Sequence, residues 1–405
     1  MCNFSDILEA SCRRPKMISK IWHLKMRNVF IIIVLSIFTF GGCAFDHKEA
    51  FIKKGEEYYR KKSYKKAIEE FTKYIKVKYN SFKGYYERGL AYVAERNMGR
   101  AIFDFTKAIE LKPDSAQAYC WRGDAYGIRR NLDQAISDYS KAIEIEPNYI
   151  NAYVGRGYAY SNKGDYTQAL ADCNKALEIS PNKVLVYNCM GFAFLKKGDY
   201  DQAISECNKI IEIQPNQVKA HINRSIIYSK KGDYEKAIAD ANKAIEINPE
   251  NAMGYIARSF AYTSKGDYTQ ALADCNKALE ISPDNAIAYS YRGFVYLKKG
   301  DYELALADLN QAIKIDPNYP NSYGWRGIVY KNMGMLDQSL ADLTKVIKLD
   351  PNNGDFYFGR ATVYYEMKEY DKSWEDIKTA EKLKIEFYSK DYSLFIEKLK
   401  QASGK

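Results

Sequence analysis

The sequence predicts an all-α protein, a solenoid of about ten helix–turn–helix repeats followed by a capping helix. Three observations lead to this prediction. The stretch KGDYTQALADCNKALEISP occurs at residues 163–181 and again, unchanged, at residues 265–283. A small residue recurs every 34 positions from Gly55 to Ala361, and an aromatic residue follows each of them by three positions. Eight of the ten prolines occupy one phase of the same period, which is typical of stacked helical repeats.

Each repeat is expected to form two amphipathic helices joined by a short turn. In residues 163–181, Asp165 is placed to cap a helix that Pro181 ends. Tyr166 and the apolar residues that follow it at helical spacing form one buried face. Residues 151–163 predict the partner helix. Two helices of about a dozen residues cannot bury their apolar faces alone, so the units must stack on one another.

The segment before the repeats differs in composition. Residues 1–25 show neither periodicity nor helix caps and are interpreted as an upstream start-site extension. Residues 26–42 contain a cation, a 12-residue apolar run and two glycines, which is typical of a secretory signal. The run is short for a membrane span, which needs about 20 residues. Residues 43–47 are expected to be an anchor and a linker.

Cys43, directly after Gly41 and Gly42, resembles the lipobox cysteine of bacterial lipoproteins, which is acylated and becomes the new N-terminus. Phe40 departs from that pattern, because the box usually has Leu there. The resemblance implies lipidation at Cys43, with the repeats facing the periplasm or the cell exterior. A retained signal anchor is the alternative.

The repeats span residues 48–387 and resemble the tetratricopeptide repeat (TPR) family in their recurring aromatic, small, alanine and proline positions. Small residues are needed where two helices cross closely, and aromatic residues fill the gaps beside them. The resemblance implies a right-handed superhelix whose first helices line a concave face. In this family that face binds extended or helical segments of other proteins, so a non-catalytic interaction scaffold is expected.

One departure from the family pattern is regular. Where the family often has Leu, just before the small residue, this chain has Lys or Arg in nine of ten repeats, and Met190 is the exception. An acidic residue follows each of these positions by 16 residues, as Asp172 follows Arg156. We interpret the two residues as a structural ion pair between the helices of one repeat. Anion binding is the alternative.

The concave face implied by the resemblance is apolar in its middle. Two positions of each first helix are expected on this face. One directly follows the recurring small residue, and the other lies four residues before that first position in the chain. The residues expected to bind partner segments are Tyr86, Tyr158, Phe192, Ile226, Ile256, Phe260, Phe294 and Ile328. Packing against the neighbouring repeat is the alternative role for many of them. The chain lacks the Lys and Asn set with which some TPR proteins grip C-terminal carboxylates, so such a clamp is not expected.

Positive charge is concentrated near the N-terminus. Of the formal net charge of +10, residues 1–42 supply +4 and residues 43–80 supply +5, which leaves +1 for residues 81–405. Nucleic-acid binding needs a basic stripe, so the nearly neutral body argues against it. The lysines of the first repeat suit either anionic lipid head groups or a solvated helix surface.

No residues are spaced for catalysis, and neither a metal site nor a cofactor is expected. His221, one of three histidines, occupies a position that holds Tyr in other repeats, which favours packing. Cys173, Cys207 and Cys275 share one position of the second helices and are interpreted as core thiols. The segments outside the repeats are short for a catalytic domain, so an enzyme with a TPR arm is disfavoured.

Residues 388–405 predict a capping helix with Leu394, Phe395 and Leu399 directed inward. The expected function is therefore an exported, membrane-anchored protein scaffold for envelope assembly or enzyme docking. The alternatives are a cytoplasmic TPR scaffold and a signal-anchored accessory subunit of a larger enzyme or of a secretion or pilus complex.

Overall fold

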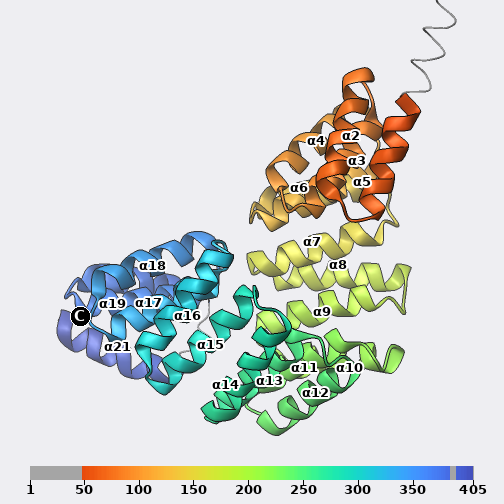
Figure 1. The fold of residues 1–405 in the computed structure, drawn as a ribbon. Coiled ribbons are helices and arrows are strands. Elements are labelled where there is room, and N and C mark those ends of the chain that lie inside the picture. The colour runs from red at the N-terminus through yellow and green to blue at the C-terminus, as the bar shows by residue number, and fades with distance from the viewer. Residues whose placement is uncertain (1–47, 384–388, 405) are drawn as a thin grey trace, which may run out of the picture. The chain divides into compact units, whose positions relative to one another are not determined.

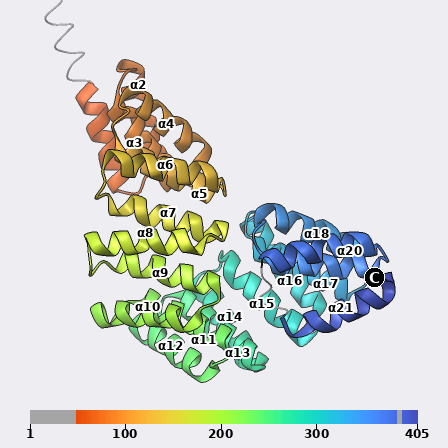
Figure 2. The same ribbon diagram turned by 180° about the vertical axis from the view of Figure 1, so that it is seen from behind.

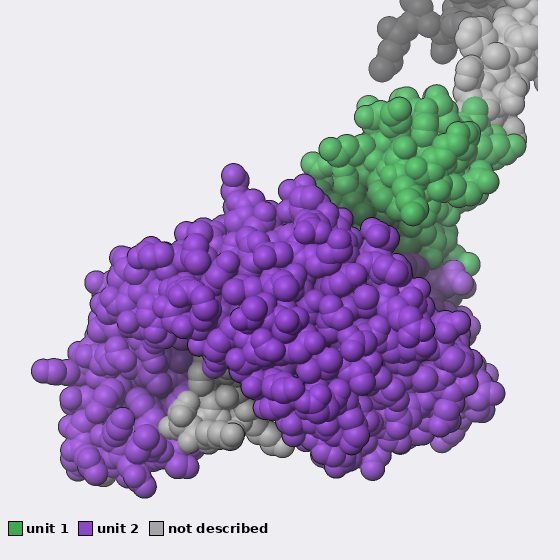
Figure 3. Space-filling view, turned by 60° about the horizontal axis from the view of Figure 1, so that its bottom comes forward, with its two compact units in different colours: residues 1–113 green, residues 114–405 purple. Residues whose placement is uncertain are grey.

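The computed structural model describes residues 48–383 and 389–404, and every regular element in these ranges is a helix (Figure 1). The predicted all-α repeat solenoid is confirmed. The predicted signal segment, Cys43 and the linker lie outside the described residues, as do residues 384–387 at the end of the predicted repeat region. The chain divides into two compact units, residues 1–113 and 114–405, which Figure 3 colours separately.

The first unit contains a helix over residues 48–60 followed by α2 (Tyr64–Val77), α3 (Phe82–Ala94) and α4 (Met98–Leu111). Its apolar core includes Ile52, Phe71 and Tyr74, which are buried between these helices. From α3 to α20, odd numbers denote the first helix of a repeat and even numbers denote the second.

The second unit continues the same alternation, and Figure 2 shows it from behind. Its helices are α5 (Ala116–Ile128), α6 (Leu132–Ile145), α7 (Ile150–Lys163), α8 (Tyr166–Ile179), α9 (Val184–Lys197), α10 (Tyr200–Ile213), α11 (Val218–Lys231), α12 (Tyr234–Ile247), α13 (Ala252–Lys265), α14 (Tyr268–Ile281), α15 (Ala286–Lys299), α16 (Tyr302–Ile315), α17 (Pro320–Asn332), α18 (Leu336–Leu349), α19 (Gly354–Glu366), α20 (Tyr370–Leu383) and α21 (Ser389–Ser403).

The turn inside each repeat contains a left-handed residue, and a side-chain cap follows it at the start of α4, α6, α8, α10, α12 and α14. Asp165 Oδ1 accepts a hydrogen bond from the backbone N–H of Gln168 at 3.1 Å, as predicted. The preceding residue, Gly164, has φ +88°, a conformation that glycine adopts without steric cost. The equivalent position is left-handed in every repeat, and where it is not glycine it is Lys62, Arg96, Arg130 or Lys368. The backbone path is therefore the same whether or not glycine is present.

The small residues lie where the two helices of a repeat approach each other most closely. A Cβ atom added at Gly89 would lie 2.8 Å from Phe105 Cε1, so this position admits no side chain without movement of the ring. Alanines such as Ala101 and Ala135, on the second helices, are completely buried. Within the second unit, first helices of successive repeats also contact each other, as α11 contacts α13 and α13 contacts α15.

α21 covers the end of the last repeat. Leu399 is completely buried, and Phe395 contacts Phe358 and Tyr365 with ring centroids 5.4 Å apart in both cases. Leu394 is 56% exposed, so the prediction that it points into the core was wrong. It lies at the edge of a pocket instead.

Candidate partner-binding groove

The predicted groove residues lie on first helices but do not share one environment. Tyr86 belongs to α3 in the first unit, where its ring stacks on Phe82 with centroids 5.4 Å apart. The other seven belong to the second unit, on α7, α9, α11, α13, α15 and α17. Three of these line one pocket, one lines a second pocket, and three pack against neighbouring side chains.

The central pocket is a cavity of about 330 Å³ between α7, α9, α10 and α11. Its apolar wall consists of Tyr158, Phe192, Leu195, Ile210, Ile226 and Ile227. Three of the predicted groove residues therefore meet in one site. The Tyr158 and Phe192 rings lie 5.3 Å apart, and Lys196 Nζ lies 5.9 Å from the centre of the Phe192 ring.

Polar side chains at the edge of the central pocket provide hydrogen-bonding groups. Asn188 Nδ2 donates to the carbonyl oxygen of Val184 at 3.0 Å, which leaves its amide oxygen and its second N–H for a ligand. Asn223 adds a second amide and Lys219 an ammonium group, both from α11. Burial raises the pKa of Tyr158 to about 12, so its hydroxyl stays neutral at physiological pH and can both donate and accept. The site therefore combines an apolar wall with a few directed polar groups.

Phe260 and Phe294 occupy the same position as Phe192 in their repeats, yet aromatic residues of the next repeat cover them. Tyr291 packs edge-on against Phe260 with centroids 6.0 Å apart, and Trp325 stacks on Phe294 at 4.7 Å. In both cases the covering residue lies 31 positions ahead in the chain, and 31 positions ahead of Phe192 is Asn223. A large aromatic residue at this position fills the groove, whereas a smaller residue leaves it open.

Ile256 and Phe294 are 2% and 3% exposed and belong to the packed core. Ile256 contacts a cluster that includes Ala278, Leu279 and Ala288. For these residues the structure supports packing, the alternative role that the sequence left open. The covering residues Tyr291 and Trp325 were missed because aromatics recur at other positions of the repeat, while this position has no periodic preference.

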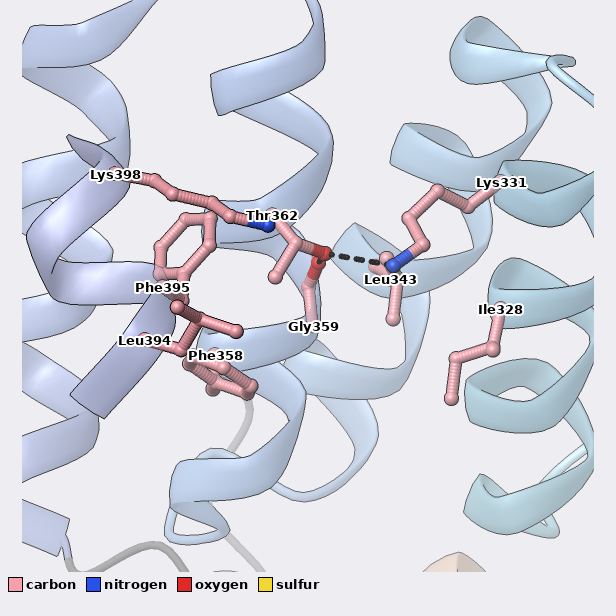
Figure 4. Close-up of a pocket in the computed structure, with 9 residues that line it drawn as sticks. All are labelled: Ile328, Lys331, Leu343, Phe358, Gly359, Thr362, Leu394, Phe395 and Lys398. Carbon is pink, nitrogen blue, oxygen red and sulfur yellow. Dashed lines mark hydrogen bonds between the residues drawn. The ribbon is translucent and has the colours of Figure 1, made fainter. Parts of the chain in front are cut away.

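The C-terminal pocket, of about 320 Å³, lies between α17, α18, α19 and α21 (Figure 4). Ile328 lines it, and the residue 31 positions ahead is Gly359, whose lack of a side chain keeps the pocket open. Lys331 Nζ donates to Thr362 Oγ1 at 3.3 Å across the pocket. Figure 4 shows Lys398 extending from α21 toward Thr362. This pocket therefore has an apolar interior and lysines at its edge.

The predicted ion pairs form in nine of the ten repeats. In the first, Lys54 Nζ lies 3.8 Å from Glu70 Oε1. The other eight are Arg88–Asp104, Arg122–Asp138, Arg156–Asp172, Arg224–Asp240, Arg258–Asp274, Arg292–Asp308, Arg326–Asp342 and Arg360–Asp376, which we call the arginine row.

Arg156 illustrates the geometry of the arginine row. Its Nε and Nη2 donate to the two carboxylate oxygens of Asp172 at 2.8 and 2.7 Å, and its Nη1 donates to Ser140 Oγ at 2.8 Å. One side chain thereby joins α6, α7 and α8. The hydrogen bond to Asp172 raises the pKa of Arg156, while burial opposes this change. Because the guanidinium and the carboxylate satisfy each other, the ion-pair interpretation is confirmed.

The repeat with Met190 departs from this arrangement. Glu206, the acidic residue of that repeat, is 2% exposed. Its Oε1 accepts a hydrogen bond from Lys209 Nζ at 2.8 Å, and its Oε2 has no hydrogen-bond partner among the described residues. A buried carboxylate oxygen without a partner is unusual, since burial removes its bonds to water.

The cysteines agree with the sequence prediction only in part. Cys173 and Cys189 form a disulfide between α8 and α9, so the interpretation of Cys173 as a free core thiol was wrong. The shared position on the second helices concealed this, because the pairing depends on a residue of the next first helix. Cys207 and Cys275 are buried free thiols, and burial raises the pKa of each to about 12.

His221 replaces a tyrosine in a recurring contact. The hydroxyls of Tyr153 and Tyr187 donate to the carbonyl oxygens of Pro147 and Pro181 at 3.1 and 2.6 Å. His221 Nε2 lies 3.0 Å from the carbonyl oxygen of Pro215, the equivalent proline. The packing role predicted for this residue is confirmed. Among residues 48–383 and 389–404, no helix has both the length and the apolar character needed to cross a bilayer.

Comparisons with known proteins agree with the repeat architecture. Models described as tetratricopeptide repeat match residues 82–115, 116–149, 150–183, 173–205, 218–251 and 320–353, and one described as TPR repeat matches residues 260–300 and 295–334. A tetratricopeptide repeat protein from Parabacteroides merdae is similar in structure, with a TM-score of 0.51 and 22% identity over 61% of this chain and 98% of its own. Yeast Tom70 gives a TM-score of 0.50 and 16% identity over 88% of this chain and 96% of its own. At these identities the structural likeness shows the fold alone. The comparison with curated proteins gives no match.

Proposed function

Because the chain belongs to the tetratricopeptide repeat family, we propose that it is a non-catalytic scaffold that binds segments of partner proteins on its first helices. The observation that carries this proposal is the central pocket, where Tyr158, Phe192 and Ile226 converge beside polar groups. The fold alone fits many functions, so the proposal depends on the chemistry of this pocket.

The central pocket suits an apolar anchor side chain of a partner segment. Its volume of about 330 Å³ is at the lower end of the range of about 300–1,000 Å³ that is usual for small-ligand sites. One or two apolar side chains would fill it. The amides of Asn188 and Asn223 can then bond to the backbone of the bound segment, which fixes its direction. Interface energy usually concentrates in a few such buried anchors.

The proposal also places the scaffold outside the cytoplasm, held at a membrane through its N-terminus. The signal-like composition of residues 26–42 and the position of Cys43 support export and lipidation. The partners would then be proteins of the cell envelope, in assembly or in enzyme docking. A cytoplasmic scaffold and a signal-anchored accessory subunit of a larger complex are the alternatives.

The groove is tested by changing Phe192 and Ile226 to Ser together. A pull-down from detergent-solubilised membranes, followed by mass spectrometry, identifies the partner retained by the parent protein. We expect the double variant to lose that partner, because truncating an interface anchor costs about 2 kcal/mol or more. The helical circular dichroism should stay unchanged, since both side chains line an open pocket.

Two control variants separate binding from folding. Leu304→Ser removes an exposed apolar side chain from α16 and should leave binding intact. Phe294→Ser removes a core ring and should lower the melting temperature, because such losses destabilise a fold by about 3–5 kcal/mol. Partner binding that persists in a folded Phe192→Ser, Ile226→Ser protein would place the binding site elsewhere.

The anchor is tested by metabolic labelling with a fatty-acid probe. The parent protein should incorporate the probe, and Cys43→Ala should not, leaving an unprocessed or released species. Label in the Ala variant, or none in the parent, would contradict lipidation at Cys43. Cell fractionation then distinguishes the alternatives, since a cytoplasmic scaffold appears in the soluble fraction of the parent.

A further inference from the structure

The joint between α8 and α9 combines two departures from the repeat pattern. It lacks the arginine of the arginine row, because Met190 stands there, and it contains the Cys173–Cys189 disulfide. We propose that this disulfide replaces the missing arginine as the link between α8 and α9, and that the protein acquires its native form in an oxidising compartment. This inference concerns covalent structure and does not depend on the proposed binding function.

The position of the disulfide matches the position of the missing hydrogen bond. Elsewhere, the arginine donates through Nη1 to the residue 16 positions earlier, on the preceding second helix, as Arg224 does to Asn208 Oδ1 at 2.6 Å. For Met190 that residue is Asn174, and a thioether has no proton to donate to it. Cys173 and Cys189 directly precede these two residues and are also 16 positions apart. The disulfide therefore connects the same two helices at the same level.

α12 and α13 are linked by an arginine hydrogen bond instead of a disulfide. The two positions equivalent to Cys173 and Cys189 hold Ala241 and Ala257, which cannot form a covalent link. There, Arg258 Nη1 donates to Asn242 Oδ1 at 2.7 Å. One joint thus has two alanines and an arginine, and the other has two cysteines and a methionine.

The disulfide is packed among three helices. Both cysteines are completely buried, and a Cβ atom added at Gly157 of α7 would lie 2.8 Å from Cys189 Sγ and 3.1 Å from Cys173 Sγ. Cys189 is also adjacent to Asn188 and close in sequence to Phe192, both of which line the central pocket. The disulfide therefore packs against α7 and lies directly beside the α9 wall of that pocket.

Forming the bond requires an oxidant of the disulfide class, such as a protein dithiol–disulfide oxidoreductase or oxidised glutathione. One cysteine thiolate attacks the oxidant and forms a mixed disulfide, and the second displaces it. The chain gains one S–S bond and loses two protons and two electrons, while the oxidant is reduced to two thiols. Because the sulfur atoms are buried in the folded protein, exchange takes place before packing is complete. Such bonds persist in exported proteins and are rare in the cytosol.

The duplicated sequence offers an internal control. α14 has the same sequence as α8, so Cys275 corresponds to Cys173 in an identical helix. The residue 16 positions ahead of Cys275 is Tyr291, and Cys275 is a free buried thiol. A change at Cys275 therefore removes a buried sulfur and its 3.0 Å contact with Ser259 Oγ, but no covalent link.

The first test maps the bond in the full chain taken from its native cells. Thiols are trapped with acid, alkylated with iodoacetamide and digested with trypsin without reduction. The tryptic peptide of residues 164–175 is identical to that of residues 266–277, so the chain should carry Cys275→Ala to make the Cys173 peptide unique. We expect residues 164–175 linked to residues 184–196. Alkylation of both Cys173 and Cys189 in the trapped protein would overturn the proposal.

The second test measures whether the disulfide stabilises the contact between α8 and α9 as the arginine does between α12 and α13. The double variant Cys173→Ala, Cys189→Ala should lower the melting temperature of the oxidised protein by several degrees, whereas Cys275→Ala should lower it less. Alanine suits these positions because Ala241 and Ala257 already occupy their equivalents. Adding Met190→Arg and Glu206→Asp to the double variant recreates the α12–α13 joint and should recover most of the loss. Equal effects of the double variant and Cys275→Ala, or no recovery on adding the arginine, would contradict the replacement.

Discussion

Asp124 places a carboxylate where α3, α7, α9, α11, α13, α15 and α17 have an apolar or aromatic residue. It occupies the position of Phe192 and Phe260 in its own repeat, and the Tyr139 hydroxyl donates to its Oδ1 at 2.6 Å. Burial raises the pKa of Asp124 from its ordinary 3.8 to about 6, and the hydrogen bond from Tyr139 offsets only part of this. The native state therefore binds the Asp124 proton more tightly than the unfolded state does.

This difference predicts a pH-dependent cost at one residue. Between about pH 4 and pH 6 the unfolded chain has lost the proton that the native state still holds, so stability should fall as the pH rises through this range. A pKa difference of about two corresponds to at most roughly 3 kcal/mol at neutral pH. Asp124→Asn keeps an oxygen for Tyr139 and removes the titration.

Melting temperatures of the parent and of Asp124→Asn, measured from pH 4 to pH 7, test this prediction. The melting temperature of Asp124→Asn should equal that of the parent at pH 4 and should exceed it by a growing margin as the pH rises. A difference that does not change with pH would show that Asp124 titrates normally in the folded protein.

The candidate site also shows what a single position can and cannot predict. Phe192 and Phe294 share one phase of the repeat, and both were correctly assigned to the first-helix face. Their exposure differs because Asn223 lies 31 positions after one and Trp325 lies 31 positions after the other. The phase of a residue fixes the face on which it lies, but its exposure depends on the size of a neighbour from the next repeat.

At the scale of the helices, members of the arginine row link a first helix to the second helices on both sides, as Arg156 links α7 to α6 and α8. The Arg156 and Asp172 side chains are only 20% and 8% exposed, so the pair is poorly screened by water. Removing one partner of a buried pair leaves an unpaired charge and costs about 3–5 kcal/mol. An exposed pair is worth about 1 kcal/mol or less.

Charge reversal at this pair should therefore be strongly non-additive. Arg156→Asp and Asp172→Arg should each destabilise the protein, and the double variant should be more stable than the sum of the two losses implies. Thermal melts of the three proteins measure this. Reversal of the exposed pair Lys141–Glu144 on α6, at 50% and 64% exposure, provides the matched control and should change the melting temperature little. Simple additivity at Arg156 and Asp172 would mean that the pairing contributes nothing to stability.

The disulfide was missed at this same scale, although a signal was present. Cys173, Cys207 and Cys275 share one position, which suggested a common role as core thiols. Only Cys173 has a cysteine 16 positions ahead, the separation that also joins Ser140 to Arg156 across two repeats. Comparing positions between adjacent repeats, and not only within one, would have indicated the pair.

For the whole molecule, the repeat pattern was sufficient to predict the fold because each structural device recurs with it. The left-handed position of Gly164 recurs in every repeat, so every turn follows the same path, and caps such as Asp165 accompany it in most repeats. The pockets could not be predicted in this way, because they depend on a position that has no periodic preference. Asn223 and Gly359 open the groove at positions where Tyr291 and Trp325 close it.

The identity of α8 and α14 also has a genetic consequence. Recombination between the two coding stretches would remove or add residues in multiples of three repeats, without shifting the reading frame or the repeat phase. The shortened product would place α15 directly after a helix with the α8 sequence. Tyr291 would then face the cysteine, and Arg292 would restore the arginine row. One such deletion would remove the disulfide, Met190 and most of the central pocket together. A single genetic event would thus eliminate all three features, while the remaining repeats would still stack.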